Sequence, residues 1–215
     1  MHSSFCIGAI AIAAIAGLGV STANADLINI VSNNAASSEN LGSYTGTLSY
    51  TALTANTASI VLTLTNTTSA GVGGYITAVA LMHSSNYAGA TLTLTSSTDA
   101  DFGNLAPPVS SSPFGSFQGG ASTSSSWLGG GAPSAGVSVG QSITLTFSLT
   151  GTNMGLLSAA DLVGLHSGSY DMAVRFRGMT AGGSDKVPGL IVTPTPGAAA
   201  ALGLGGLAAC RRRRR

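Results

Sequence analysis

Apolar residues alternate with serine and threonine along several segments of this 215-residue chain, a pattern that few folds can accommodate. In the clearest case, Ser142–Thr150, one isoleucine, two leucines and a phenylalanine are separated by threonine and serine. Successive side chains of a β-strand point to opposite faces, so this spacing predicts a strand with one buried and one solvated face. An α-helix would scatter the same residues around its whole circumference.

The same two-residue period occurs in five further segments: Thr47–Leu53, Ser59–Thr65, Tyr75–Met82, Thr91–Thr95 and Tyr170–Arg177. Because a short polar turn, Thr54–Thr57, separates the first two, they predict a β-hairpin. In the last segment Arg175 and Arg177 fall on the polar side, where we expect both to face solvent. A single short helix is predicted after Ser158, since Asp161 completes a capping box.

Charged residues make up only 7% of the chain. Long helix-forming side chains are scarce, and many short strands with glycine-rich turns favour an all-β protein. We expect an antiparallel β-sandwich of the jelly-roll or Ig-like type. Between Ala106 and Gly136 the alternation gives way to Pro, Ser and Gly, which predicts a long loop that is either functional or a disordered insertion.

The amino terminus has the pattern of a secretory signal peptide. An apolar segment, Phe5–Val20, is followed by Ala23-Asn24-Ala25, the small-x-small sequence after which a signal peptidase cuts. Cleavage there leaves Asp26 as the first residue. The sequence thus predicts a helical signal peptide over residues 1–25 and an exported protein.

The carboxyl terminus carries three features in order. A turn of Pro194, Thr195, Pro196 and Gly197 precedes an apolar run, and the chain ends in Arg211, Arg212, Arg213, Arg214 and Arg215. Guanidinium groups do not readily cross a bilayer, so we expect the arginines to stay on the cytoplasmic side while the apolar run inserts as a short helix. Nucleic acid or anionic lipid is the other usual partner of a basic block, but the signal peptide argues against that role.

Together these features resemble the PEP-CTERM sorting tail, with Thr195 in place of the family's central glutamate. The resemblance covers only the end of the chain. It implies a bacterial protein that is exported, is inserted transiently in the membrane through its tail, and is processed there by the membrane enzyme exosortase. It also implies a final place in the cell envelope, at the cell surface or in the extracellular matrix. It implies no particular activity of the domain.

These boundaries predict four segments: the signal peptide over 1–25, a β-sandwich domain over 26–181, a linker over 182–193 and the sorting tail over 194–215. Both cysteines, Cys6 and Cys210, lie in segments expected to be removed, so the domain has no disulfide bond. Three basic and seven acidic residues give the chain between those segments a net charge of −4. We therefore expect no basic patch of the kind that binds nucleic acid.

One candidate metal site lies in an expected turn. Asp99, Asp101 and Asn104 bring two carboxylates and an amide close together in the sequence. Calcium prefers oxygen ligands of this kind, although Asp and Asn are also common turn formers. Calcium is therefore the one cofactor that the sequence suggests.

The 106–136 loop contains three large side chains, Phe114, Phe117 and Trp127. Aromatic rings on an ordered loop would either form a platform for sugar rings or cover one end of the core. The sequence leaves both roles open.

A nucleophile motif is matched only in spacing. Gly136–Gly140 fits G-x-S-x-G around Ser138, but that motif requires a strand before the serine and a helix after it, and here a loop precedes and a strand follows. Nothing in the sequence places His83 or His166 beside a serine and an orienting acid. We therefore predict no catalytic residue. Asn66-Thr67-Thr68 is a glycosylation sequon.

The sequence as a whole predicts a non-enzymatic surface or extracellular-matrix protein. Signal peptidase and exosortase are its expected processing partners, and extracellular polysaccharide or another matrix component is its expected environment. The alternative is a carbohydrate-binding surface module that uses the aromatic residues of the 106–136 loop, with or without calcium.

Overall fold

The computed structural model describes residues 25–129 and 131–192 of the chain. The predicted signal peptide up to residue 24, including Ala23, lies outside the described residues. So does the predicted sorting tail, with Pro194–Gly197 and Arg211–Arg215. What the structure shows is therefore the domain between the two predicted sorting signals.

The described residues form short strands and four 3₁₀ helices, with no α-helix among them. The helices are η1 (Asn34–Ala36), η2 (Pro133–Ala135), η3 (Met154–Leu156) and η4 (Ala159–Leu162). The strands are β1 (Ala25–Ser32), β2 (Tyr44–Ala52), β3 (Thr57–Asn66), β4 (Gly73–His83), β5 (Thr91–Ser97), β6 (Gly103–Leu105), β7 (Val109–Ser110), β8 (Ser116–Ser122), β9 (Ser142–Thr150), β10 (Leu165–His166), β11 (Ser169–Tyr170), β12 (Met172–Met179) and β13 (Ser184–Ile191).

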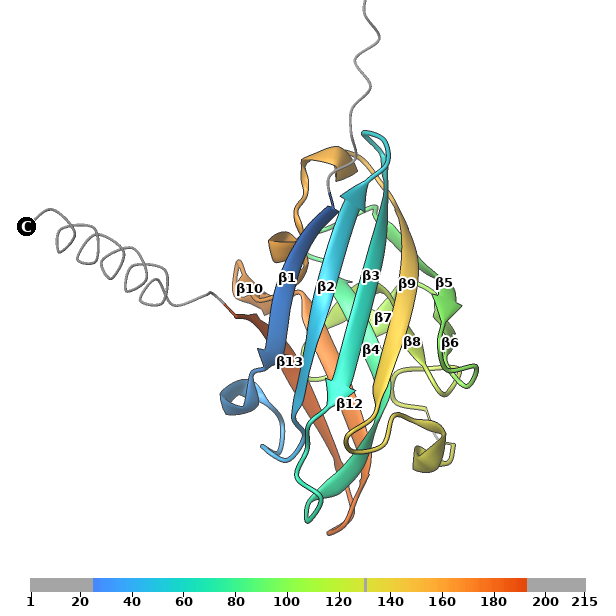
Figure 1. Cartoon of the computed structure of the whole chain (residues 1–215). Coiled ribbons are helices and arrows are strands. Elements are labelled where there is room, and N and C mark those ends of the chain that lie inside the picture. Colours follow the sequence, from blue (N-terminus) through green and yellow to red (C-terminus); the bar gives the residue numbers. More distant parts are fainter. Residues whose placement is uncertain (1–24, 130, 193–215) are drawn as a thin grey trace, which may run out of the picture.

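Eleven of these strands form one antiparallel sheet in the order β5-β9-β3-β2-β1-β13-β12-β4-β8-β6, with β7 beside β8. The sheet folds over on itself, so that β1, β2, β3 and β9 lie in front of β4, β8 and β12 in Figure 1. Its two end strands meet, because the Leu94 N–H on β5 donates to Asn104 Oδ1 on β6 at 2.7 Å. The predicted all-β, antiparallel, sandwich-like character is confirmed. The finer jelly-roll or Ig-like assignment stays a prediction.

The core lies between the two layers and is built by the alternating segments. Leu48 and Tyr50 of β2 pair with Leu62 and Ile60 of β3, and all four are at most 2% exposed. The predicted hairpin is confirmed, and β9 has the predicted bounds. Burial of apolar surface stabilises by about 25 cal/mol per Å², so these inward faces hold the layers together.

The prediction of a long structureless loop between Ala106 and Gly136 is wrong. That segment contains β7, β8 and η2, and β8 pairs with β4. Almost every residue of β8 is buried on both faces, so its sequence lacks the alternation of a half-buried strand. Two glycines also remove side chains from the strand pattern of β8, because neighbouring backbone leaves no room for them. A Cβ on Gly119 would lie 2.3 Å from the Leu92 carbonyl oxygen, and one on Gly120 would lie 2.1 Å from the Val79 carbonyl oxygen.

The predicted linker over 182–193 is also wrong, because Ser184–Ile191 forms β13 between β1 and β12. The domain therefore extends beyond residue 181. Asp185 is fully buried and accepts hydrogen bonds from the backbone N–H groups of Leu41 and Gly42 at 2.8 and 2.9 Å. A charged residue and a proline, Pro188, made this strand look like a linker in the sequence. The short helix after Ser158 is confirmed as η4, with its capping box.

Candidate binding surfaces

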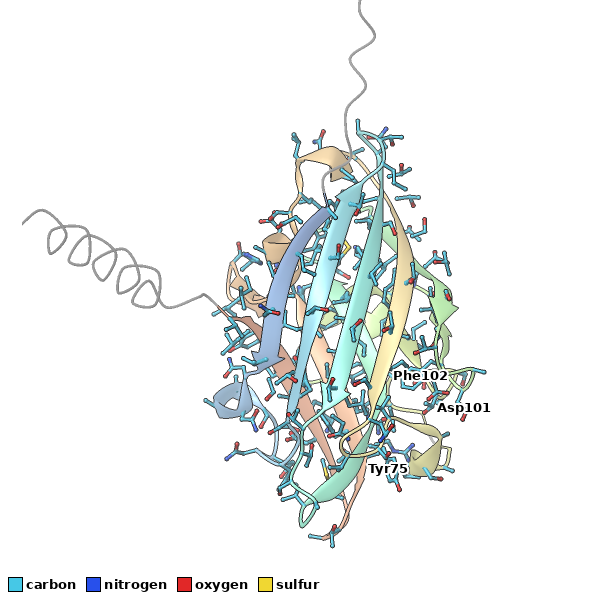
Figure 2. All side chains as sticks on the ribbon, viewed as in Figure 1. Tyr75, Asp101 and Phe102 are labelled. Carbon is cyan, nitrogen blue, oxygen red and sulfur yellow. The ribbon has the colours of Figure 1, made fainter. Side chains whose placement is uncertain are left out.

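The outer face of β2, β3 and β9 consists almost entirely of hydroxyl side chains. Twelve outward positions form four rows across the three strands, and we call this surface the hydroxyl face: Thr45, Thr65 and Ser142; Thr47, Thr63 and Thr144; Ser49, Val61 and Thr146; Thr51, Ser59 and Ser148. Each is partly or fully exposed, whereas the apolar residues between them are buried. In Figure 2 these strands face the viewer and carry short side chains, many with oxygen at the end.

Two of the four rows of the hydroxyl face are joined by side-chain hydrogen bonds between strands. The Thr63 and Thr144 hydroxyls lie 3.0 Å apart, and those of Thr65 and Ser142 lie 2.7 Å apart. Neighbouring strands are about 4.8 Å apart and same-face residues about 6.8 Å apart along a strand, so the hydroxyls form a regular lattice. None of the twelve side chains is charged.

A cleft opens beside the single tryptophan of the chain, and we call it the Trp127 cleft. Its volume is about 510 Å³, within the range of small-molecule sites. Its two walls come from the segments 104–110 and 125–128. The lining residues are Asn104, Leu105, Ala106, Pro108, Val109, Ser110, Ser125, Ser126, Trp127 and Leu128, none of them charged.

Two arginines fix the segment that follows Trp127. Arg175 Nη1 donates to the carbonyl oxygens of Trp127 and Gly129, the latter at 3.2 Å. Arg177 Nη1 donates to Gly129 O at 3.3 Å and Gly131 O at 3.2 Å. The prediction that both arginines face solvent is wrong for Arg175, which is 9% exposed because this segment covers it. Burial, and then the charge of Arg177, lowers the pKa of the Arg175 guanidinium.

The three candidate aromatic residues lie in or against one apolar cluster. Phe117 is fully buried, Trp127 is 2% exposed, and Phe114 packs from the edge as a half-buried residue. Phe114 also meets Tyr170 in a T-shaped arrangement with ring centroids 5.8 Å apart. Phe117 and Trp127 therefore do not form an exposed platform for sugar rings. They cover the core, which was the alternative role left open by the sequence.

The candidate calcium residues Asp99 and Asp101 lie in the turn from β5 to β6 and Asn104 lies in β6, and two of the three already use a side-chain oxygen in a hydrogen bond. Asp99 Oδ1 accepts the Asp101 N–H at 3.0 Å, and Asn104 Oδ1 accepts the Leu94 N–H at 2.7 Å. Figure 2 shows Asp101 at the outer rim of the molecule, next to Phe102, which is buried. Across residues 25–129 and 131–192, no three His, Cys, Asp or Glu side chains are grouped to hold a metal ion.

One histidine does have an orienting acid, which sequence spacing did not indicate. His166 Nδ1 contacts Asp171 Oδ2, and Asn86 Nδ2 donates to Asp171 Oδ1 at 2.7 Å. Asp171 is fully buried, while His166 is partly exposed. The β10–β11 hairpin brings the pair together across five residues. His83 instead lies edge-on to Phe117, with ring centroids 5.3 Å apart.

Two other sequence motifs, those around Ser138 and Asn66, take part in holding the fold. Val137 bridges Ile76, and β9 follows Ser138, so Ser138 is not at a strand-to-helix turn. Asn66 of the sequon is fully buried, and its Nδ2 donates to the carbonyl oxygens of Gly74 at 3.0 Å and Val137 at 2.9 Å. A buried amide with these partners is not presented to a glycosylating enzyme.

The residues at the predicted signal-cleavage site begin the first strand. Ala25 opens β1, and Asp26 Oδ2 accepts the Ala159 N–H at 2.8 Å, which joins the start of the domain to η4. At the other end, the Val192 N–H donates to Asn29 O at 2.9 Å. Within the described ranges, no helix has the length and apolarity needed to cross a membrane.

Comparison of the chain with protein-family models, with curated proteins and with solved structures gives no match. Its function is therefore argued from its residues and their geometry.

Proposed function

We propose that this is a non-enzymatic protein of the bacterial cell surface or extracellular matrix, exported by its signal peptide and processed by exosortase at its tail. The hydroxyl face is the observation that carries the proposal. Its uncharged, regularly spaced donors and acceptors suit contact with hydrated, hydroxyl-rich polymers such as extracellular polysaccharide. Individual hydrogen bonds of this kind contribute only about 1 kcal/mol each, so adhesion requires many of them at once.

The end of the domain supports processing at the tail. β13 lies inside the sheet and ends at Ile191, and the PEP-CTERM-like motif, Pro194–Gly197, begins three residues later in the sequence. A cut near Pro196 would leave every strand of the sheet intact. Exosortase could therefore bind and cleave the tail without unfolding the domain.

Charged substitutions on the hydroxyl face test the adhesive part of the proposal. Thr47→Lys with Thr146→Lys places two cations on different rows and strands of that face. Because a neutral lattice would then carry charge, we expect retention on washed matrix from the producing cells to fall about tenfold, equivalent to about 1.4 kcal/mol.

The matched control carries the same two added charges on exposed loop threonines, as Thr67→Lys with Thr152→Lys. We expect it to be retained like the unaltered protein. Equal retention of all three proteins, with unchanged thermal unfolding, would contradict adhesion through the hydroxyl face.

A further inference from the structure

The Trp127 cleft is walled by two segments that are distant in the sequence, and both walls are fixed. The first wall includes two residues of β6 and both residues of β7, and these strands pair with β8. The second wall, 125–128, is continuous with the carbonyl oxygens held by Arg175 and Arg177. The Ser122 hydroxyl also donates to Ser126 O at 3.5 Å. A cleft whose walls are already in place binds a ligand with little further ordering.

The chemistry of the lining specifies an uncharged ligand with polar and apolar sides. Ser110, Ser125 and Ser126 offer hydroxyl groups, and the Asn104 amide retains its Nδ2 donors, because Oδ1 is the atom that accepts Leu94 N–H. The remaining lining residues are apolar, and Leu128 is 54% exposed at the surface. Few polar groups set in an apolar lining are typical of sites for small organic ligands.

The nearby cations do not make this an anion site. The Nη1 groups of Arg175 and Arg177 are engaged by backbone carbonyl oxygens, and neither arginine lines the cleft. No carboxylate lines it either, so an ammonium group would find no counter-charge. Burying a charge without a partner is strongly unfavourable, which excludes charged ligands in favour of neutral ones.

Trp127 lines the cleft, but its ring nitrogen is buried. Trp127 Nε1 is buried and has no hydrogen-bond acceptor among the described residues. Buried indole N–H groups are usually hydrogen-bonded. Because Trp127 Nε1 has almost no accessible surface, it gives a ligand in the cleft no donor, and hydrogen bonding to a ligand falls to the serine and asparagine groups of the lining.

We propose that the Trp127 cleft binds a neutral mono- or disaccharide unit. A sugar ring has a hydroxyl rim and apolar C–H faces, which match the serine and asparagine groups and the Leu105, Val109 and Leu128 side chains. The unit comes either from free sugar or from the end of a polysaccharide chain. This site is separate from the hydroxyl face and does not depend on it.

The single tryptophan makes the test specific, because all tryptophan emission comes from Trp127 at the cleft. The mature protein is titrated with glucose, galactose, mannose, cellobiose and maltose, and with glucuronic acid as the charged comparison. We expect a saturable change in emission with at least one neutral sugar and none with glucuronic acid. No saturable change with any neutral sugar, or tighter binding of glucuronic acid, overturns the proposal.

A matched pair of variants locates the binding. Ala106→Phe fills the cleft, whereas Ala100→Phe adds the same ring to an exposed alanine that does not line it. We expect Ala106→Phe to weaken binding at least tenfold and Ala100→Phe to leave it unchanged. Leu128→Ala, which removes a half-exposed wall residue, is the second variant if Ala106→Phe unfolds. Equal affinity of all variants overturns the assignment to this cleft.

Retention on an insoluble neutral polysaccharide distinguishes the two sources of the sugar. It is measured in the Thr47→Lys, Thr146→Lys background, where the hydroxyl face contributes least to retention. Loss of the remaining retention on adding Ala106→Phe shows that the cleft takes a unit of a polymer, and binding of free disaccharide with no retention in that background shows that it takes free sugar. The fluorescence titrations use proteins with an intact hydroxyl face, so failure of the cleft proposal leaves the proposed adhesive function untouched, and the reverse also holds.

Discussion

Two buried tyrosines differ by a single hydrogen bond. The Tyr50 hydroxyl donates to Met154 O, whereas the Tyr44 hydroxyl is buried without a partner among the described residues. Both side chains are at most 2% exposed and lie in the same core. A buried polar group without a partner is destabilising, while a paired one contributes modestly. The two residues therefore separate the effect of the ring from that of its hydroxyl.

Removing each hydroxyl should change the free energy of unfolding differently. We expect Tyr50→Phe to lower the free energy of unfolding by about 1 kcal/mol or more, since Met154 O loses its donor. Tyr44→Phe should be neutral or slightly stabilising, because it removes only an unpaired group. Urea unfolding of both variants measures this. A loss in Tyr44→Phe as large as that in Tyr50→Phe would contradict the hydrogen-bond assignment.

The same tyrosines give the domain a pH dependence in alkali. Burial and the charge of Asp161 raise the pKa of Tyr50 to about 12, and burial raises the pKa of Tyr44 as well. In the unfolded chain a tyrosine titrates near pH 10, so from about pH 10 upward the unfolded state loses protons that the folded state keeps. Stability is thus complete below pH 10 and falls as pH rises toward 12.

Urea unfolding between about pH 8 and pH 11 tests this dependence. We expect the free energy of unfolding to be flat at first and then to decline, with a shallower decline in Tyr50→Phe. The part of the ionised-tyrosine absorbance that is lost in Tyr50→Phe should appear together with unfolding. Stability that rises over this interval would show that the sign is wrong.

Among the elements, β8 closes the sheet by close backbone approach. Gly119 lies against β5, where an added Cβ would be 2.3 Å from Leu92 O and 2.7 Å from Leu92 Cβ. A contact with backbone cannot be relieved by a side-chain rotation, so β5 and β8 would have to separate. The junction of the two ends of the sheet thus depends on a residue without a side chain.

We expect Gly119→Ala to lower the free energy of unfolding by about 2 kcal/mol or more, the range seen for overpacking. Gly71→Ala is the control, because nothing lies within 4 Å of its added Cβ. Thermal unfolding of the two variants compares them directly. Equal melting temperatures would argue against close packing between β5 and β8.

Sequence periodicity predicted β2, β3 and β9, whose outer face meets water, and also β4 and β12, although both are largely buried; it missed β1, β8 and β13. β2, β3 and β9 alternate because one face meets water. β8 is buried on both faces, and β13 contains a buried aspartate and a proline, so neither shows the pattern. The loop and linker predictions failed for the same reason: tertiary burial, which local sequence does not encode, decides these two strands.

The candidate sites were predictable in composition but not in arrangement. Asn104 and Trp127 were both singled out, for calcium and for sugar, and the structure places them in one cleft. Arg175 was expected in water and instead holds the carbonyl oxygens beside that cleft. His166 and Asp171 meet only because a hairpin turns between them. Long-range contacts of this kind leave no local signal in a single sequence.

At the scale of the whole molecule, charge is scarce and unevenly placed. The seven acids of the chain include buried structural ones, Asp171 and Asp185, while the hydroxyl face carries none. A hydrogen-bonding exterior with few charges, on a domain that lies between two predicted sorting signals, is consistent with a place in a hydrated matrix. The proposed function therefore requires that the two ends of the chain be removed during export.

The intact mass of the protein recovered from outside the producing cells tests this most directly. We expect a chain that begins at Asp26 and has lost Arg211–Arg215, with its end near Pro196 and with any attached group visible as added mass. Recovery of the full chain from the cytosol, with both termini present, would contradict it.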